Sequence, residues 1–421
     1  MSITSYPEVV RLSGNGGNVV SFEGTTALDA FGRLRVSEPY TLFDSQNRYS
    51  ADNQFDTSTS TDGALTYLPN ETSCALTTST SSGSEVVRQT FRTFPYQPGK
   101  SLLLLATFVM NEAKTNLRQR VGYFNVENGC FLEQSDNTLS FVIRTFTSGA
   151  VTEFSRVTQS QWNKDKLDGT GPSGITLNVT DTQILFMDFE WLGAGNVRCG
   201  FVIDGVFIVA HTFQHANQNT SHIVYMTTAI LNVRYEITNT GVTASSSTLR
   251  QICSTLISEG GYSQMTADTT VRRTTALTGI STTFVPLISI RLNSSHLGAV
   301  ILLNRANVLP LTTQTYETVI VKNSVLTSPS WVTGTFQNID YDVSATAMTI
   351  PTASSILQSD YLTSTAQGRQ VLSAPTGYNF DYQLGASLAG VSDILTLGIR
   401  TTSPTPTADA LSLLAFYDLT F

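Results

Sequence analysis

The chain has 421 residues, of which 41% are hydrophobic and 13% charged, and its formal net charge is -8. This balance argues against nucleic acid as the main partner and against an anionic membrane surface, because both ligands require a basic protein surface. Ser and Thr are abundant, Lys is scarce and β-branched residues are frequent. The composition therefore predicts an all-β protein that buries real cores and is long enough for more than one domain.

Residues 1–84 contain Gly clusters and Ser/Thr runs and predict an extended N-terminal arm with short strands. One stretch of it, DAFGRLRVSEPYTLFDSQNRY (residues 29–49), concentrates charged and large apolar side chains. In its GRLRV segment the two arginines are spaced to share one face of a strand, with Leu and Val on the other. The expected docking residues are Phe31, Arg33, Leu34, Arg35, Val36, Tyr40 and Phe43. The sequence leaves open whether they cover an edge of the chain's own sandwich or dock on a neighbouring subunit.

Residues 85–262 read as a succession of short strands separated by turns, which predicts a β-sandwich. Asp204-Gly205 lies between two apolar runs and predicts a type I′ hairpin. Hairpin turns are also expected at residues 127–129 and 148–149. Residues 248–258, TLRQICSTLIS, could instead form a short helix.

The remaining chain divides into two parts. Residues 263–280 are expected to be a linker, and residues 281–421 again read as short strands. The second part predicts a smaller C-terminal β-sandwich or barrel.

The chain has four cysteines far apart in sequence: Cys74, Cys130, Cys199 and Cys253. They form no CxxC pair, so we expect buried free thiols, no metal cluster and no cofactor. The first ten residues have no basic region and no apolar core, and the longest apolar run, residues 101–110, is too short for a bilayer. We therefore expect a protein made in a cytoplasm, with no secretion signal and no membrane insertion.

Two family resemblances emerge from these segments. The strand order in residues 85–240, and ILFMDFEWLGAGNVRCGFVIDGVFIVAHTF in particular, resembles concanavalin-A-like (laminin G-type) jelly-rolls. The motifs DAFGRLRVSEPYTLFDSQNRY, FPYQPGKS, RVGYFNVENGCFLEQ and SQWNKDKLDGTGPSGITLNVT are similar to a family of virion structural proteins of tailed bacteriophages, cyanophage-like and typical of marine and freshwater hosts. The second resemblance runs through residues 28–240. It implies a structural component of the virion and no particular catalytic activity.

GTGPSG (residues 169–174) has the GxGxxG form of a dinucleotide loop. A strand rather than a helix follows it, so we interpret it as a surface loop. Together with the preceding residues it could bind a glycan or a protein partner. The candidate residues are Trp162, Lys164, Asp165, Lys166 and Asp168. The alternatives are solvated loop charges and, for Trp162 and Trp191, core or rim packing.

Asp188 and Glu190 lie two residues apart on a predicted strand and share one face. Paired carboxylates can hydrolyse a glycosidic bond. The chain has only a DxE pattern, however, where concanavalin-like hydrolases carry ExDxE, so we favour an ion pair with Arg198 or Arg144 and expect no enzyme.

Three histidines, His211, His215 and His222, fall within one short segment. A metal site would need these side chains to converge, which spacing alone does not provide. We expect polar loop histidines and no catalytic or metal-binding residue.

The combined prediction is a non-enzymatic bacteriophage virion protein that assembles as a symmetric homo-oligomer, with a trimer preferred. A tail-associated position (fibre, adaptor or baseplate periphery) is favoured. The first alternative is a capsid decoration or head-fibre protein, and the second is a protein that recognises host surface glycans. The expected partners are further copies of the chain and other virion proteins.

Overall fold

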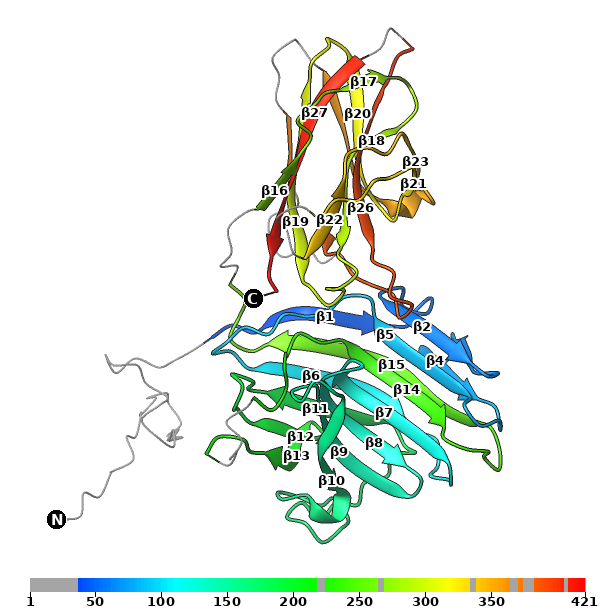
Figure 1. Cartoon of the computed structure of the whole chain (residues 1–421). Helices are drawn as coiled ribbons and strands as arrows, with labels where there is room; N and C mark the ends of the chain where they lie inside the picture. The colour runs from blue at the N-terminus through cyan, green and yellow to red at the C-terminus, as the bar shows by residue number, and fades with distance from the viewer. Residues whose placement is uncertain are drawn as a thin grey trace, which may run out of the picture.

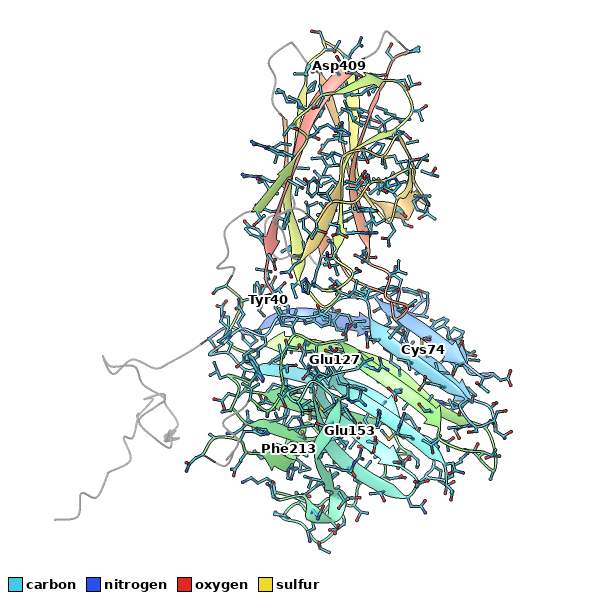
Figure 2. All side chains as sticks on the ribbon, viewed as in Figure 1. Tyr40, Cys74, Glu127, Glu153, Phe213 and Asp409 are labelled. Atoms are coloured by element: carbon cyan, nitrogen blue, oxygen red, sulfur yellow. The ribbon has the colours of Figure 1, made fainter. Side chains whose placement is uncertain are left out.

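The computed structural model describes residues 37–217, 224–263, 269–333, 338–363, 370–373, 382–404 and 408–420. These residues form two β-sandwiches, one standing on the other in Figure 1, with side chains filling the space between the sheets of each (Figures 1 and 2). Short 3-10 turns lie at Gln159–Gln161 (η2) and Ala353–Ser355 (η3). Within the described ranges, no helix has the length and apolar character needed to cross a membrane. The predicted all-β fold is confirmed.

The first sheet of the central sandwich has eight strands in the order β13-β12-β11-β6-β15-β4-β3, with β1 also paired to β15. Its strands are β1 (Tyr40–Gln46), β3 (Ala64–Leu68), β4 (Ser73–Thr78), β6 (Leu102–Val109), β11 (Gln183–Phe189), β12 (Val197–Ile203), β13 (Val206–Phe213) and β15 (Ser247–Ser258). Strand β6 shows why the sheet forms, because its buried residues alternate with half-buried ones and direct Leu104, Ala106 and Phe108 into the core.

The second sheet has seven strands in the order β10-β9-β8-β7-β14-β5-β2. Its strands are β2 (Phe55–Ser60), β5 (Glu85–Thr90), β7 (Leu117–Phe124), β8 (Gly129–Ser135), β9 (Thr138–Thr145), β10 (Thr152–Thr158) and β14 (Val233–Asn239). Both sheets are antiparallel and pack face to face around one apolar core. This arrangement is the predicted antiparallel β-sandwich.

The expected hairpin turns are present. Ile203 of β12 pairs with Val206 of β13, and both Asp204 and Gly205 have positive φ, at 51° and 76°. These angles are those of the predicted type I′ turn. The β7–β8 and β9–β10 hairpins also form where the sequence predicts them.

Residues 248–258 were expected to allow a short helix, and this prediction is wrong. They belong to β15, which lies between β6 on one side and β4 and β1 on the other. A β-bulge between Gln251 and Cys253 shifts the register. The bulge interrupts the apolar alternation of the strand, so that Leu249, Ile252 and Leu256 acquire a spacing that resembles a helix.

The central sandwich begins earlier than the expected boundary at residue 85. Strands β1, β3 and β4 belong to the eight-stranded sheet and β2 to the seven-stranded sheet. From Tyr40 onward the expected arm is therefore part of the sandwich. Strands this short and rich in Ser and Thr form because they add to the edges of sheets whose cores are already buried.

The C-terminal sandwich consists of two five-stranded sheets and a small two-stranded one. The first sheet contains β16 (Thr269–Arg272), β17 (Leu277–Ile280), β19 (Ile301–Pro310), β25 (Gln370–Ser373) and β27 (Ala408–Asp418). The second contains β18 (Val285–Leu292), β20 (Thr315–Lys322), β22 (Ile339–Asp342), β24 (Ile356–Thr363) and β26 (Ile394–Thr401), and β21 (Val325–Thr327) pairs with β23 (Ala347–Thr349). Strands β16 and β17 occupy part of the expected linker, so this domain also begins earlier than predicted.

The two sandwiches are joined by hydrogen bonds as well as by the chain. The backbone N–H of Ala386 donates to the carbonyl of Phe91 at 2.9 Å, and Gln383 Nε2 donates to the carbonyl of Thr93 at 2.8 Å. Gly385 permits this approach, because a Cβ there would lie 2.7 Å from the Phe91 carbonyl oxygen. The contact fixes one sandwich against the end of the other.

Candidate functional site

The outer face of the eight-stranded sheet is left uncovered by the described residues, and we call it the open face. One row of outward side chains crosses six of its strands. In order from β1 to β13 the row is Gln46, Cys253, Thr107, Ile184, Val202 and Phe207. The row is polar at the β1 end and apolar at the β13 end, so the open face offers two different surfaces.

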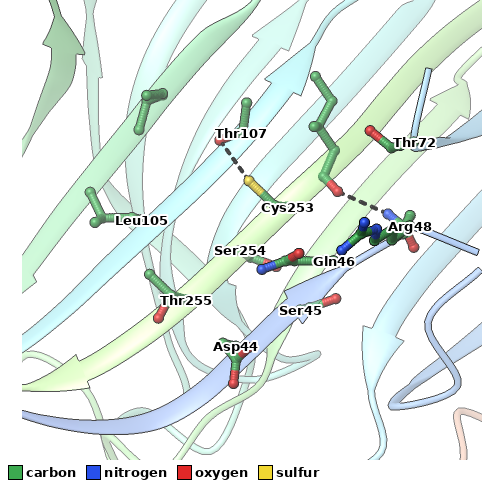
Figure 3. A pocket seen from close by; sticks show the side chains of 13 residues that line it. Asp44, Ser45, Gln46, Arg48, Thr72, Leu105, Thr107, Cys253, Ser254 and Thr255 are labelled. Atoms are coloured by element: carbon green, nitrogen blue, oxygen red, sulfur yellow. Dashed lines mark hydrogen bonds between the residues drawn. The ribbon is translucent and has the colours of Figure 1, made fainter. Parts of the chain in front are cut away.

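A groove of about 650 Å³ lies at the polar end of the open face (Figure 3). Its rim carries Asp44, Gln46 and Arg48, whose side chains are exposed. The floor is built from β6, β11 and β15. The floor residues are Leu105, Thr107, Ile184, Ile252, Cys253 and Thr255. Carboxylate, amide and guanidinium groups above a partly apolar floor suit an extended ligand with both polar and apolar surface, such as a peptide strand or a sugar chain.

The apolar end of the open face centres on the β12–β13 hairpin. Phe207 of β13 is 52% exposed on this face, and its ring packs on Phe186 with centroids 5.1 Å apart. Ile184 continues the patch toward the groove and is also exposed. Contiguous exposed apolar side chains are typical of protein contact surfaces.

A smaller cavity of about 400 Å³ contains the predicted carboxylates. Asp188 lies directly opposite Arg198 in the β11–β12 register and forms an ion pair with it, as one of the two expected alternatives requires. Ser101 Oγ also donates to Asp188 Oδ1 at 2.7 Å, and the Asp188 side chain is buried. Glu190 lines the same cavity but is exposed. Of the two carboxylates, Asp188 is therefore engaged in an ion pair and Glu190 faces solvent.

The predicted partner loop has mainly a structural role at its first residues. Trp162 is buried in the core, where its ring lies 4.7 Å from that of Phe141 between centroids, so it presents no stacking surface. Asp165 is buried and accepts backbone N–H bonds from Leu167 at 2.9 Å and Ser173 at 2.8 Å. Of the five candidates only Lys164, Lys166 and Asp168 are exposed.

The same loop closes part of the free edge of β13. Asn163 Nδ2 donates to the Thr212 carbonyl at 2.9 Å, and the Thr212 N–H donates to Asn163 Oδ1 at 2.9 Å. The backbone N–H groups of Lys164 and Asp165 both donate to the Ala210 carbonyl. An edge strand whose backbone groups are satisfied in this way is protected from non-specific pairing.

Two of the three histidines singled out in the sequence, His211 and His215, are buried and have packing roles. The Asn163 N–H donates to His211 Nδ1 at 3.3 Å, and burial lowers the pKa of His211 to about 4. His215 Nδ1 lies 2.7 Å from the Gly195 carbonyl, and its ring stacks on Tyr225 at 3.9 Å between centroids. His222 lies outside the described residues. Within the described part of the chain, no three His, Cys, Asp or Glu side chains are grouped closely enough to hold a metal ion.

The outer face of the seven-stranded sheet carries a network that the sequence did not predict, and we call it the ionic face. Its charged residues are Arg118, Arg120, Glu133, Arg144, Glu153, Arg156, Arg234 and Glu236. Strand register places Glu236 opposite Arg120 and Arg120 opposite Glu133. Arg120 Nε lies 2.7 Å from Glu133 Oε2, and Arg120 Nη1 lies 3.3 Å from Glu236 Oε1. Opposite charges in directly opposed positions stabilise the pairing of strands.

Most of this network is buried. Burial alone would raise the pKa of Glu236, but Arg234, Arg120 and Arg118 together hold it below the usual value. Arg120 and Arg144 also lie over the Phe131 ring, at 4.9 Å and 5.1 Å from its centroid. The arginines therefore satisfy their charge and pack on aromatic rings within the same surface.

The predicted docking residues fall in two groups. Phe31, Arg33, Leu34, Arg35 and Val36 lie outside the described residues. Tyr40 and Phe43 lie in β1, which pairs with β15 of the same chain. Phe43 is buried, with ring centroids 5.0 Å from Phe94. For these two residues the contact is with the chain's own sandwich.

No protein-family model and no curated protein matches the chain. Solved structures with similar folds cover about half of it. A carbohydrate-binding module (CBM2) of the evolved Dit protein of Lactobacillus casei BL23 phage J-1 has 7% identity and a TM-score of 0.36, and covers 54% of this chain and 100% of its own. A β-glucanase of Bacillus licheniformis has 8% identity and a TM-score of 0.32, with 53% of this chain and 99% of its own covered. These likenesses assign no role to any residue.

Proposed function

We propose that this chain is a non-enzymatic structural protein of a bacteriophage virion that assembles as a symmetric homo-oligomer, a trimer being the preferred state. The observation that supports this proposal is the open face, where Phe207 and Ile184 are exposed and Ile184 also lines the groove. A surface of this kind gains stability when another protein chain covers it. Within the virion, a tail-associated position is favoured over capsid decoration.

The carboxylate cavity supports a role without catalysis. A glycosidase needs two carboxyl groups that act on one bond, one as acid and the other as nucleophile or base. Asp188 is held by Arg198 and Ser101, and only Glu190 is exposed to solvent. These contacts of Asp188 suit an ion pair that links β11 and β12 rather than proton transfer. Incubation of the purified protein with host capsule or lipopolysaccharide is expected to leave the polymer length unchanged, and shortening would contradict this part of the proposal.

The assembly proposal is tested by the mass of the full chain in solution, measured by sedimentation equilibrium. The expected result is a discrete oligomer, and a monomer at all concentrations would refute it. Immunogold electron microscopy of virions that contain the protein then tests its position. Label on the tail is expected, whereas label on the capsid alone would favour the decoration alternative.

A second candidate function is recognition of a host glycan, favoured by the groove. Asp44, Gln46 and Arg48 offer hydrogen-bond donors and acceptors at its rim. A glycan array should be probed with the full chain rather than with residues 85–262, because β1 supplies that rim. Binding that is lost in Gln46→Ala but kept in Ser58→Ala, on the ionic face, would support it, and silence across host surface polysaccharides would count against it.

A further inference from the structure

Two cysteines distant in sequence meet inside the central sandwich. Cys130 lies on β8 of the seven-stranded sheet and Cys199 on β12 of the eight-stranded sheet. Their Sγ atoms are 3.7 Å apart, across the interface between the sheets. A disulfide bond is about 2.05 Å long, so the two sulfur atoms need to approach by only about 1.7 Å.

The other two cysteines are differently placed. Cys74 Sγ donates to Asn47 Oδ1 at 3.4 Å, and Cys253 Sγ donates to Thr107 Oγ1 at 3.3 Å. Both therefore have an oxygen as their partner. Cys130 and Cys199 are the only two cysteines of the chain whose sulfur atoms lie within bonding reach of each other, and all four cysteines are described.

We infer that Cys130 and Cys199 are a site of oxidative modification, at which a disulfide bond cross-links the two sheets of the sandwich. The inference is independent of the proposed virion role. It applies when the protein meets a small-molecule disulfide, such as oxidised glutathione, before the sandwich closes or while it is locally open. In the closed sandwich neither thiol is exposed, and burial together with the neighbouring Cys130 raises the pKa of Cys199, so the thiolate is scarce.

The reaction proceeds in two exchange steps. The thiolate of one cysteine attacks a sulfur of the small disulfide, which forms a mixed disulfide and releases one small thiolate. The thiolate of the second cysteine then attacks the protein sulfur of the mixed disulfide and displaces the second small thiolate. The protein loses two protons and two electrons, and the small disulfide becomes two small thiols.

The cross-link should stabilise the sandwich against heat. It connects positions that are 69 residues apart in sequence, and therefore restricts the unfolded chain strongly. It also joins the two sheets at a point where both side chains already face each other. The oxidised protein is therefore expected to melt several degrees above the reduced protein.

The experiment is refolding of the full chain in a mixture of oxidised and reduced glutathione, with a parallel sample in a reducing agent. Thiols are counted in denaturant with Ellman's reagent, and peptides are mapped by mass spectrometry without reduction. The expected result is four free thiols in the reduced sample, two in the oxidised sample, and a linked peptide pair that contains Cys130 and Cys199. Oxidation should lower the mass of the intact chain by about 2 Da.

Matched variants decide which cysteines react. Cys130→Ser and Cys199→Ser should each lose the cross-link, whereas Cys74→Ser and Cys253→Ser should keep it. Melting of each variant under reducing conditions shows whether it folds. Four free thiols in the oxidised wild-type chain, a link between other cysteines, or an oxidised form that melts at or below the reduced form would each overturn the inference.

Discussion

The two outer faces of the central sandwich differ in how far their own side chains cover them. On the ionic face, Arg120, Glu133 and Glu236 bury one another within a network of ion pairs. On the open face, Phe207 and Ile184 remain exposed, and Ile184 also lines the groove. The comparison suggests that one face stabilises the sandwich and the other makes contacts.

The edges follow the same division. Strand β10, at the edge of the ionic face, carries Glu153 and Arg156, and charges at an edge discourage further pairing. Strand β13, at the edge of the open face, has no charged residue and relies on the Asn163 loop for part of its protection. The hairpin end of β13 is therefore the point where another chain can approach most easily.

The largest expected effect is on the ionic face. Arg120→Met should lower the free energy of unfolding by about 3–5 kcal/mol, because it leaves the buried Glu133 and Glu236 without their central partner. Urea unfolding followed by circular dichroism measures the change. Arg250→Met is the matched control, since the Arg250–Glu71 pair is exposed, and it should cost less than about 1 kcal/mol. Equal effects of the two substitutions would contradict the structural role of the ionic face.

A second expected effect depends on pH and concerns β13. Burial lowers the pKa of His211 to about 4, from 6.5 in the unfolded chain, so the folded state favours the neutral ring. The unfolded state then binds more protons between these values, and stability is full above pH 6.5 and falls toward pH 4 by on the order of 2 kcal/mol. His211→Asn keeps an acceptor for the Asn163 N–H and should flatten this part of the stability curve. An unchanged curve would mean that another group causes the loss.

A smaller effect is expected where the loop covers the edge of β13. Asn163→Ala removes two hydrogen bonds to the Thr212 backbone and should cost about 1 kcal/mol. Hydrogen exchange of the Thr212 amide should accelerate, while exchange in β7 should stay unchanged. If exchange at Thr212 remains slow, water or another group replaces Asn163 and the loop does not protect the edge.

Local chemistry made part of this fold predictable. Asp204-Gly205 specifies its hairpin because both residues tolerate positive φ, which few other pairs do. The β15 segment was not predictable in the same way, because its bulge between Gln251 and Cys253 is set by the neighbouring strands. The domain boundary was missed for a related reason, since β1 and β2 are stable only as additions to existing sheets.

The site was harder to predict than the fold. The Asp188–Arg198 pair was predicted as one of two alternative ion pairs. The ionic face was not, although Arg118, Arg120, Arg234 and Glu236 occupy alternate positions in their strands. Such residues usually face solvent singly, and only the register shows that Glu236, Arg120 and Glu133 form one row. The groove likewise depends on β1 meeting β15, positions about 200 residues apart.

The most direct test introduces one negative charge on either outer face and measures the mass of the full chain in solution. Phe207→Glu on the open face and Ser58→Glu on the ionic face both replace an exposed residue, and urea unfolding of each variant shows whether it remains folded. Sedimentation equilibrium should show an oligomer for the wild-type chain and for Ser58→Glu, and a monomer for Phe207→Glu. An oligomer that persists in Phe207→Glu and dissociates in Ser58→Glu would contradict the assignment of assembly to the open face.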